Sequence, residues 1–174
     1  MSLRRLPLFG ALALAGLFAF GCAGYRVGGV GGKNIQGVNT VYIPVIKNKT
    51  LEPTVEVPTT TAIVRAFDKD GTLATSQSND GDSQLDVVIV DVRRSILTPE
   101  QLDGQAGNQF ELTLVARVTF INRKLGKKIL DNVLVQGSNS YFINRDQVEG
   151  ERQALPMAEE ALAKNIVGLV TEGW

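Results

Sequence analysis

Residues 110–142, FELTLVARVTFINRKLGKKILDNVLVQGSNSYF, decide the fold that this sequence predicts. In the first half of this stretch apolar and polar side chains alternate, which places each set on one face of a β-strand. Segment 122–126, NRKLG, supplies turn residues and a glycine that accepts a positive φ angle. We therefore predict two long antiparallel strands, 110–123 and 127–142. The first should bury Phe110, Leu112, Leu114, Ala116, Val118 and Phe120, and turn Glu111, Thr113, Val115, Arg117 and Thr119 to the other face.

Two further strand segments precede this hairpin. Residues 84–94 contain DVVIVDV, which is apolar on both faces as expected of an inner strand. Residues 38–46, VNTVYIPVI, are β-branched and aromatic, but Pro44 cannot donate to a strand ladder and indicates an edge or a bulge. The polar, turn-rich segment 70–83 separates the two, with one short strand expected near 73–76.

Two helices complete the expected fold. The first should span about 58–69, with Pro58 in its first turn and an apolar face of Ala62, Ile63, Ala66 and Phe67. The second should span about 151–171, with Pro156 in or near its first turn and an apolar stripe of Leu155, Ala158, Leu162, Ile166 and Leu169. We predict a single α+β domain over 38–174, with a mostly antiparallel or mixed four-stranded sheet and two amphipathic helices packed on one face.

The composition excludes several classes of function. The 174 residues include no histidine and one cysteine, and 18 Lys and Arg balance 18 Asp and Glu. The chain therefore has no imidazole base, no intrachain disulfide and no Cys/His zinc site. A balanced charge also argues against nucleic-acid binding.

No constellation of residues predicts catalysis, a cofactor or a metal. The serines and threonines lack a histidine base, and no motif indicates a Ser–Lys pair. Residues 79–82, NDGD, resemble part of a calcium loop but lack its glutamate at the twelfth position. We therefore expect a protein that is not an enzyme and holds no cofactor and no metal.

The N-terminal residues 1–21 read as a bacterial lipoprotein signal peptide. Arg4 and Arg5 form its positive region, an apolar stretch follows over 6–20, and the only cysteine, Cys22, comes directly after Gly21. We predict cleavage before Cys22 and acylation of that residue. An ordinary signal peptide that leaves a free thiol, and an uncleaved anchor helix, are the alternatives.

Acylation would tether the domain to a membrane through a glycine-rich segment. Two or more acyl chains on Cys22 give stable anchoring, and Ala23, which is not acidic, favours the outer membrane. Residues 22–37 then form the tether, because their glycine spacing fits neither a Walker loop nor a dinucleotide fingerprint.

Four cations surround the predicted hairpin turn: Arg123, Lys124, Lys127 and Lys128. Cations grouped at a tip can contact the phosphates of lipopolysaccharide or another anionic lipid. The alternative is that they only keep the strand ends soluble.

Five segments, in this order, resemble the LPS-assembly lipoprotein LptE family over nearly all of the mature chain. They are GCAGY at 21–25, VYIPVIKNKTLEP at 41–53, LDVVIVDVRRS at 85–95, ELTLVARVTFINRKLGKKIL at 111–130, and the terminal helix that closes on Gly173 and Trp174. The resemblance implies a sheet with two helices on one side. It also implies a non-enzymatic outer-membrane lipoprotein that acts as plug and assembly partner of the LptD β-barrel and supports lipopolysaccharide transport to the cell surface.

One other class of function stays open. A lipid-carrier or transport-auxiliary lipoprotein would bind a lipid itself, and would need an apolar cavity between sheet and helices. A periplasmic hydrolase is disfavoured by the missing histidine.

Overall fold

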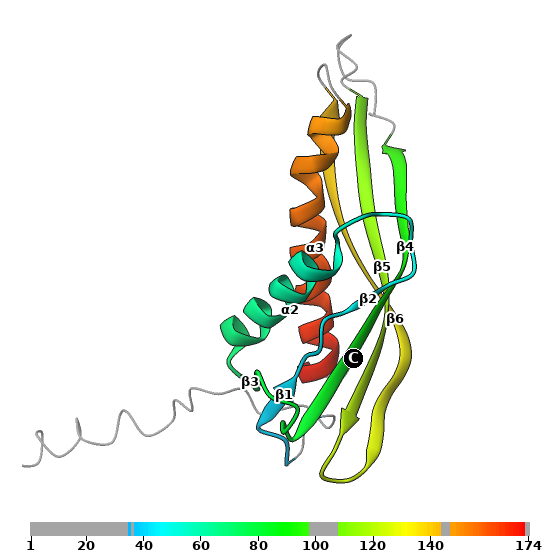
Figure 1. Ribbon diagram of the computed structural model, residues 1–174. Helices are drawn as coiled ribbons and strands as arrows, with labels where there is room; N and C mark the ends of the chain where they lie inside the picture. Colours follow the sequence, from blue (N-terminus) through cyan, green and yellow to red (C-terminus); the bar gives the residue numbers. More distant parts are fainter. Residues whose placement is uncertain (1–34, 36, 98–107, 144–146, 173–174) are drawn as a thin grey trace, which may run out of the picture.

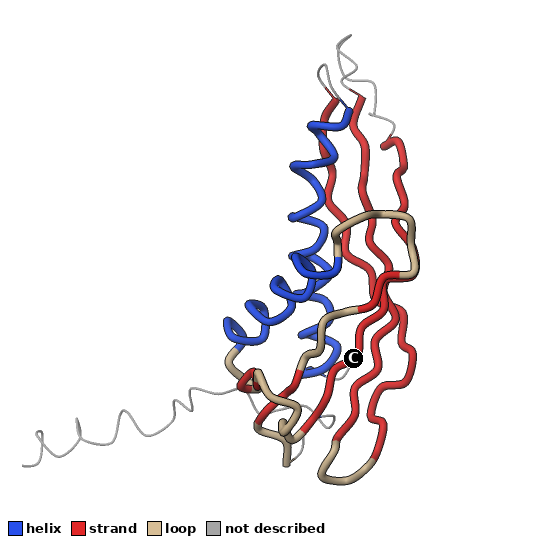
Figure 2. The backbone as a smooth tube through the Cα atoms, viewed as in Figure 1, coloured by secondary structure: helices blue, strands red, loops and turns tan. Residues whose placement is uncertain are grey.

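Three long strands and two helices dominate the part of the chain that the computed structural model describes, which is residue 35 and residues 37–97, 108–143 and 147–172 (Figures 1 and 2). The elements, in chain order, are β1 (Thr40–Tyr42), β2 (Lys47–Asn48), α2 (Glu56–Asp70), β3 (Ala74–Ser76), β4 (Ser83–Leu97), β5 (Asn108–Asn122), β6 (Lys127–Ile143) and α3 (Gln147–Glu172).

The sheet is mixed, which confirms the predicted α+β class. Its order is β3-β1-β4-β5-β6, with β2 also paired to β4. Strands β4, β5 and β6 are antiparallel, whereas β1 and β2 run parallel to β4 and β1 runs parallel to β3. The sheet has six strands in place of the predicted four.

The two additional strands are β3, where the sequence predicts a short strand near 73–76, and β2, which follows the predicted strand 38–46; that strand itself ends early, at Tyr42. Tyr42 pairs with Gln84 and Lys47 pairs with Val88, so β1 and β2 lie along the same edge of β4. Residues 43–46, which include Pro44, form no strand between them. Proline has no N–H to donate to the ladder, which accounts for a break at this position.

Both described helices pack on one face of the sheet, over the apolar side chains of the long strands (Figure 1). The predicted core face of β5 is confirmed for Leu112, Leu114, Ala116, Val118 and Phe120, which are all buried, whereas Phe110 is only partly buried. Helix α2 contributes buried Ile63 and Phe67, and α3 contributes Ala158, Leu162 and Ile166. The helices therefore cover one face of the sheet and leave the other without a helical layer.

A bulge in β4 changes which residues face the helices. The pairing with β5 shifts between Ile89 and Asp91. Before the shift Leu85, Val87 and Ile89 are buried; after it Arg94 lies opposite the buried Leu112. Arg94 is thus on the helix side, where it pairs with Glu52 at 2.6 Å and with Glu151 of α3 at 2.9 Å.

Helix α3 begins earlier than predicted and contains its proline well inside. The helix starts at Gln147 instead of 151, so the expectation that Pro156 lies near the first turn is wrong. A proline removes one backbone hydrogen bond from a helix interior. Ala154 and Ala158, on either side, are buried, so tertiary packing holds the helix through this position.

The two layers approach each other closely where α3 crosses β6. A Cβ atom placed on Gly137 would lie 2.1 Å from the backbone nitrogen of Leu162. Three residues after Leu162 in α3, the side-chain amide of Asn165 donates a hydrogen bond to the backbone carbonyl oxygen of Gln136 over 2.8 Å. Only glycine at 137 allows the helix backbone to contact the strand backbone here.

We predict that Gly137→Ala lowers the free energy of unfolding by about 2–3 kcal/mol, because the added methyl group must displace the backbone of α3. Urea unfolding followed by circular dichroism measures this change. Ser138→Ala is the matched control, because Ser138 is the exposed neighbour on the same strand and should stay within about 0.5 kcal/mol of the native protein. Equal stability of the two variants would contradict the tight contact.

Candidate functional site

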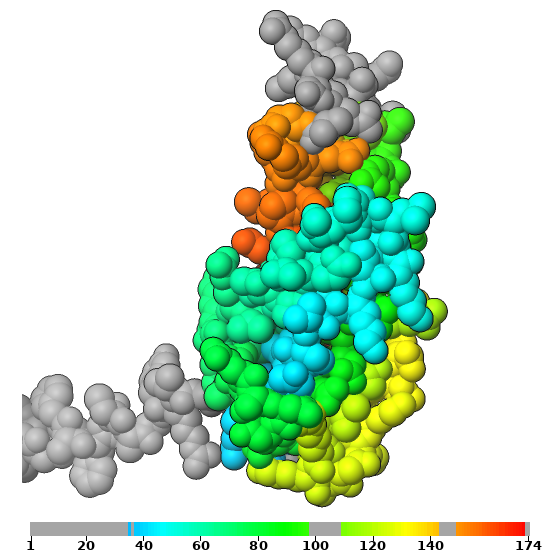
Figure 3. All heavy atoms as spheres, in the orientation of Figure 1, coloured from blue at the N-terminus to red at the C-terminus, as the bar shows by residue number. Residues whose placement is uncertain are grey.

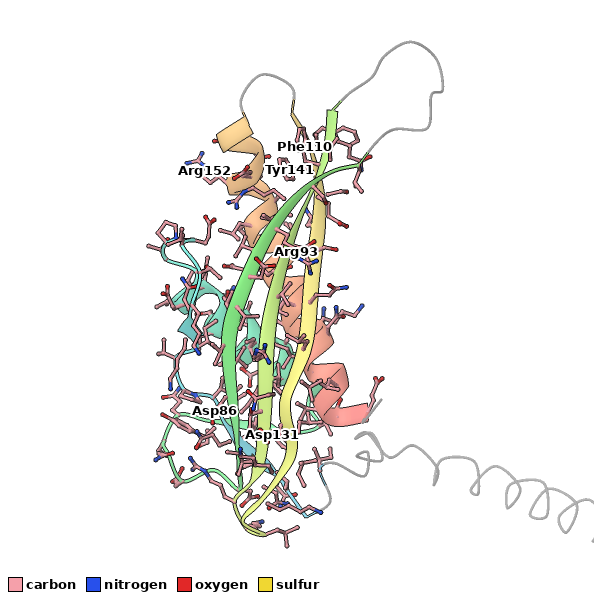
Figure 4. The ribbon with its side chains drawn as sticks, turned by 90° about the vertical axis from the view of Figure 1, so that its right-hand side faces the viewer. Asp86, Arg93, Phe110, Asp131, Tyr141 and Arg152 are labelled. Carbon is pink, nitrogen blue, oxygen red and sulfur yellow. The ribbon has the colours of Figure 1, made fainter. Side chains whose placement is uncertain are left out.

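The face of β4, β5 and β6 that carries no described helix is the broadest surface available for a partner, and Figure 4 views it. We call it the helix-free face. Its side chains alternate with the buried ones and are Asp86, Val88, Asp91, Arg93, Glu111, Thr113, Val115, Arg117, Thr119, Leu134, Gln136 and Ser138. The surface therefore mixes charges of both signs, hydroxyl groups and a few apolar groups.

Arg93 forms a bridge across this face. Its guanidinium donates to the Gln136 side chain on β6 over 3.4 Å and lies 3.4 Å from the carboxylate of Asp91 on its own strand. Beneath this bridge Thr113 and Val115 of β5 are only 9% exposed, although no described helix covers them. The long polar side chains of the outer strands thus shield the central strand.

A shallow hollow of about 430 Å³ lies beside Arg93. Arg93, Arg94, Ser95, Glu111, Thr113, Gln136 and Ser138 line it. Guanidinium, carboxylate, amide and hydroxyl groups together can hydrogen-bond polar side chains and bridging water, which is typical of a wet protein–protein interface.

Two large apolar side chains on β6 add contact area to the helix-free face. Leu134 is 58% exposed and Phe142 is 61% exposed. Aromatic and aliphatic anchors within a polar surround are the usual energetic centres of an interface.

The four cations predicted at the hairpin have different surroundings. Arg123 donates to the backbone carbonyl of Asn79 over 2.7 Å and to the side chains of Asn79 and Gln84, and it lies over the ring of Tyr42 at 5.5 Å. Its guanidinium therefore binds the hairpin to the loop before β4 and to β1.

Lys124 also makes contacts within the fold. Its ammonium lies 3.0 Å from the carboxylate of Asp82 and donates to the carbonyl of Gly37 over 3.1 Å. A hydrogen bond from the Asn39 N–H, and then Lys124, lower the pKa of Asp82.

The other two cations of the tip are exposed. Lys127 is open to solvent, and Lys128 pairs with Asp131 at 3.2 Å in an arrangement where both side chains are more than half exposed. Arg123 and Lys124 thus contact distant segments of the chain, although the Lys124 side chain stays half exposed, whereas Lys127 and Lys128 do not.

A buried glutamate lies outside the groups that the sequence singled out. Glu159 of α3 is 4% exposed and accepts a hydrogen bond from the Thr59 hydroxyl of α2 at 3.2 Å. Burial raises its pKa to about 7, and the bond from Thr59 offsets part of that rise. A sequence signal existed, because Glu159 lies four residues after Leu155 and three before Leu162, on the apolar stripe.

Glu159 borders an open groove between α2 and α3. The groove has a volume of about 1230 Å³, and its walls include Val57 and Pro58 of α2 and Met157 and Lys164 of α3. Ser138 and Asn139 of β6 also line it.

The remaining predictions concern residues that are mostly outside the described part of the chain. The signal peptide 1–21, Cys22 and the terminal Gly173 and Trp174 lie there, and so does the tether 22–37 apart from Ile35 and Gly37. Within the described residues, no helix has both the length and the apolar character needed to cross a membrane. The same residues contain no cluster of three or more Cys, Asp or Glu side chains suited to a metal ion.

Comparison with known proteins identifies a family. Residues 38–168 match the family model described as "LptE: Lipopolysaccharide-assembly". No curated protein sequence gives a significant match.

Solved structures share the fold at low sequence identity. A minor lipoprotein from Acinetobacter baumannii is 17% identical, with a TM-score of 0.55 over 76% of this chain and 92% of its own. A hypothetical protein from Chlamydia trachomatis is 10% identical, with a TM-score of 0.55 over 76% and 95% of the two chains. A Xanthomonas campestris protein is 13% identical, with a TM-score of 0.50 over 78% and 85%.

The buried Glu159 predicts a stability that depends on pH. Its pKa is raised from the usual 4.5 to about 7 in the folded protein, so the folded state holds a proton that the unfolded chain releases between these values. The contribution of Glu159 is therefore fully present below pH 4.5 and is lost as the pH rises to about 7. Each pH unit between the two pKa values lowers the free energy of unfolding by about 1.4 kcal/mol, so the total loss is about 3 kcal/mol.

Glu159→Gln should remove this dependence. The stability of the variant, measured relative to that of the native protein, should therefore be higher at pH 8 than at pH 5. Melting temperatures of both proteins at the two pH values measure the difference, and the titration of other carboxylates cancels in the comparison. Glu160→Gln, at the exposed neighbouring position, is the control. A constant difference between Glu159→Gln and the native protein across this range would show that Glu159 does not titrate as described.

Proposed function

The chain belongs to the LptE family of lipopolysaccharide-assembly proteins, and on this basis we propose that it is an outer-membrane lipoprotein, acylated at Cys22, that acts as plug and assembly partner of an LptD-like β-barrel. In this role it supports the transport of lipopolysaccharide and its insertion at the cell surface. The match over 38–168 is the observation that carries the proposal. It covers the whole sheet, helix α2 and all of α3 except its last four residues.

The helix-free face is the surface that we assign to the barrel. The interior of an outer-membrane barrel is polar and hydrated, and a plug must offer hydrogen-bonding groups over a matching length. Strand β5 has 15 residues and β6 has 17, so the face extends for about 50 Å, which exceeds the roughly 25 Å apolar band of such barrels. Arg93, Gln136 and Thr113 supply polar contacts near its middle.

The packing between sheet and helices supports the plug over the lipid carrier. A carrier needs an apolar cavity between these layers. Where α3 crosses β6, the backbone at Leu162 lies too close to Gly137 for even one additional carbon atom. The groove beside Glu159 is open, and polar and charged side chains of α2, α3 and β6 contribute to its walls.

Contact with the phosphates of lipopolysaccharide or another anionic lipid through the hairpin cations is a further part of the proposal. Arg123, Lys124, Lys127 and Lys128 all lie at one tip, and Lys127 and Lys128 are exposed without the contacts to distant segments that Arg123 and Lys124 make. A phosphate group could be bound by these two without disturbing the contacts that Arg123 and Lys124 make within the fold.

Affinity capture of the mature protein from detergent-solubilised outer membranes tests the plug. We expect an outer-membrane β-barrel in about equimolar amount. Charge reversal at two exposed positions of the helix-free face, Arg93→Glu with Arg117→Glu, should reduce the captured barrel at least about tenfold, because like charges or unpaired groups at an interface cost several kcal/mol.

The matched control reverses two exposed arginines on the helices, Arg65→Glu with Arg152→Glu, and should capture the barrel as the native protein does. Capture of a lipid without a barrel would support the carrier instead. Equal loss with both pairs of substitutions would show that the helix-free face is not the contact surface.

A further inference from the structure

The tip of the β5–β6 hairpin, residues 123–128, lies at the same end of the molecule as the start of the described chain (Figures 1 and 3). The ammonium of Lys124 joins the two, because it donates to the carbonyl of Gly37. The segment that leads from Cys22 therefore enters the fold beside this tip. We propose that the tip is a docking element for the surface of an anionic phospholipid bilayer.

Chain length places this end of the molecule near the membrane. Cys22 and Gly37 are separated by 37 − 22 = 15 residue steps, which span at most about 50 Å. The sheet extends for about the same distance beyond the hairpin, since β5 has 15 residues. An acyl anchor at Cys22 thus keeps the hairpin end within about 50 Å of the bilayer, whereas the opposite end of the sheet can lie up to about 100 Å from it.

The side chains of the tip fit the boundary between lipid head groups and acyl chains. Leu125 is 69% exposed, and the turn that presents it is completed by Gly126 at a φ of 60°. Lys127 and Lys128 follow directly and are exposed. An apolar side chain that enters the interface between ammonium groups bound to lipid phosphates is the usual arrangement of a peripheral membrane contact.

The carboxylates near the tip leave these two lysines available. Asp82 is already occupied by Lys124 and by the backbone N–H of Asn39. The pair between Lys128 and Asp131 is solvent-exposed on both sides, and pairs of that kind contribute little. Lys128 can therefore exchange its partner for a lipid phosphate.

Contacts on the inner side of the tip fix its direction. Arg123 binds Asn79 and Gln84, and its backbone N–H donates to the carbonyl of Asp82 over 2.9 Å. The side chain of Asn122 accepts a bond from the Leu125 N–H over 3.1 Å. Leu125 and the two exposed lysines are thus presented by a turn that is already attached to the rest of the fold.

The inference rests on the proposed acylation of Cys22, and the experiment separates the two. Full-length mature protein carrying Leu125→Cys is labelled with an environment-sensitive fluorophore at that position, while Cys22 is blocked by its acyl thioether. The protein is added to vesicles of phosphatidylethanolamine with phosphatidylglycerol, or of phosphatidylcholine alone. We expect a blue-shifted emission and quenching by spin-labelled lipid only on the anionic vesicles.

Charge reversal then tests the role of the lysines. Lys127→Glu with Lys128→Glu should lower the ratio of docked to undocked tips at least about tenfold, since each lysine near an anionic surface contributes about fivefold. Lys49→Glu with Lys164→Glu, at two exposed positions outside the tip, is the matched control and should leave the quenching unchanged. A label at Glu160→Cys on α3 should stay unquenched throughout.

Each other outcome overturns a defined part of the proposal. Protein that stays on the vesicles with an unquenched label at position 125 contradicts the docking while the anchor stands. Quenching that requires lipopolysaccharide in the vesicles assigns the tip to that lipid and contradicts docking to phospholipid. Mature protein whose N-terminal peptide carries no acyl group by mass spectrometry contradicts both the anchor and the docking that rests on it.

Discussion

At Gly137 the backbone of α3 packs directly on the sheet with no room for a side chain, and the arrangement of both layers depends on this contact. With no side chain on the strand, Leu162 can pack directly on β6, and Asn165 adds a hydrogen bond to the carbonyl of Gln136. Helix α2 then packs against α3, where Thr59 bonds to Glu159. The whole helical layer is thereby held on one face, and the opposite face of the three long strands stays available to a partner.

A one-residue bulge in β4 determines which of two neighbouring arginines lies on each face of the sheet. Side chains alternate along a strand, so Arg93 and Arg94 must point in opposite directions. The register shift between Ile89 and Asp91 decides which of them faces the helices. Arg94 consequently joins the sheet to α3 through Glu151, whereas Arg93 crosses the helix-free face to Gln136. Without the shift the ionic contact to the helix would be lost and the polar bridge would face the core.

Features that depend on local periodicity could be predicted from the sequence, and features that depend on distant partners could not. The alternation in 110–120 identifies the buried side of β5, and the NRKLG turn locates the hairpin, because both follow from backbone geometry within a few residues. The early start of α3, the end of β1 at Tyr42 and the pairing of β2 with β4 depend on packing against elements far along the chain. The same holds for the candidate sites, where position in the sequence groups four cations but only their partners distinguish Arg123 from Lys127.

That distinction also shows how the start of the described chain is joined to the hairpin. Arg123 binds the hairpin to the loop before β4, and Lys124 extends the contact to Gly37. The chain at Gly37 is thereby held beside one end of the two longest strands, β5 and β6, which have 15 and 17 residues. Under the proposed acylation of Cys22, the membrane attachment would therefore approach the fold at this end of the helix-free face, because the chain between Cys22 and the fold ends there.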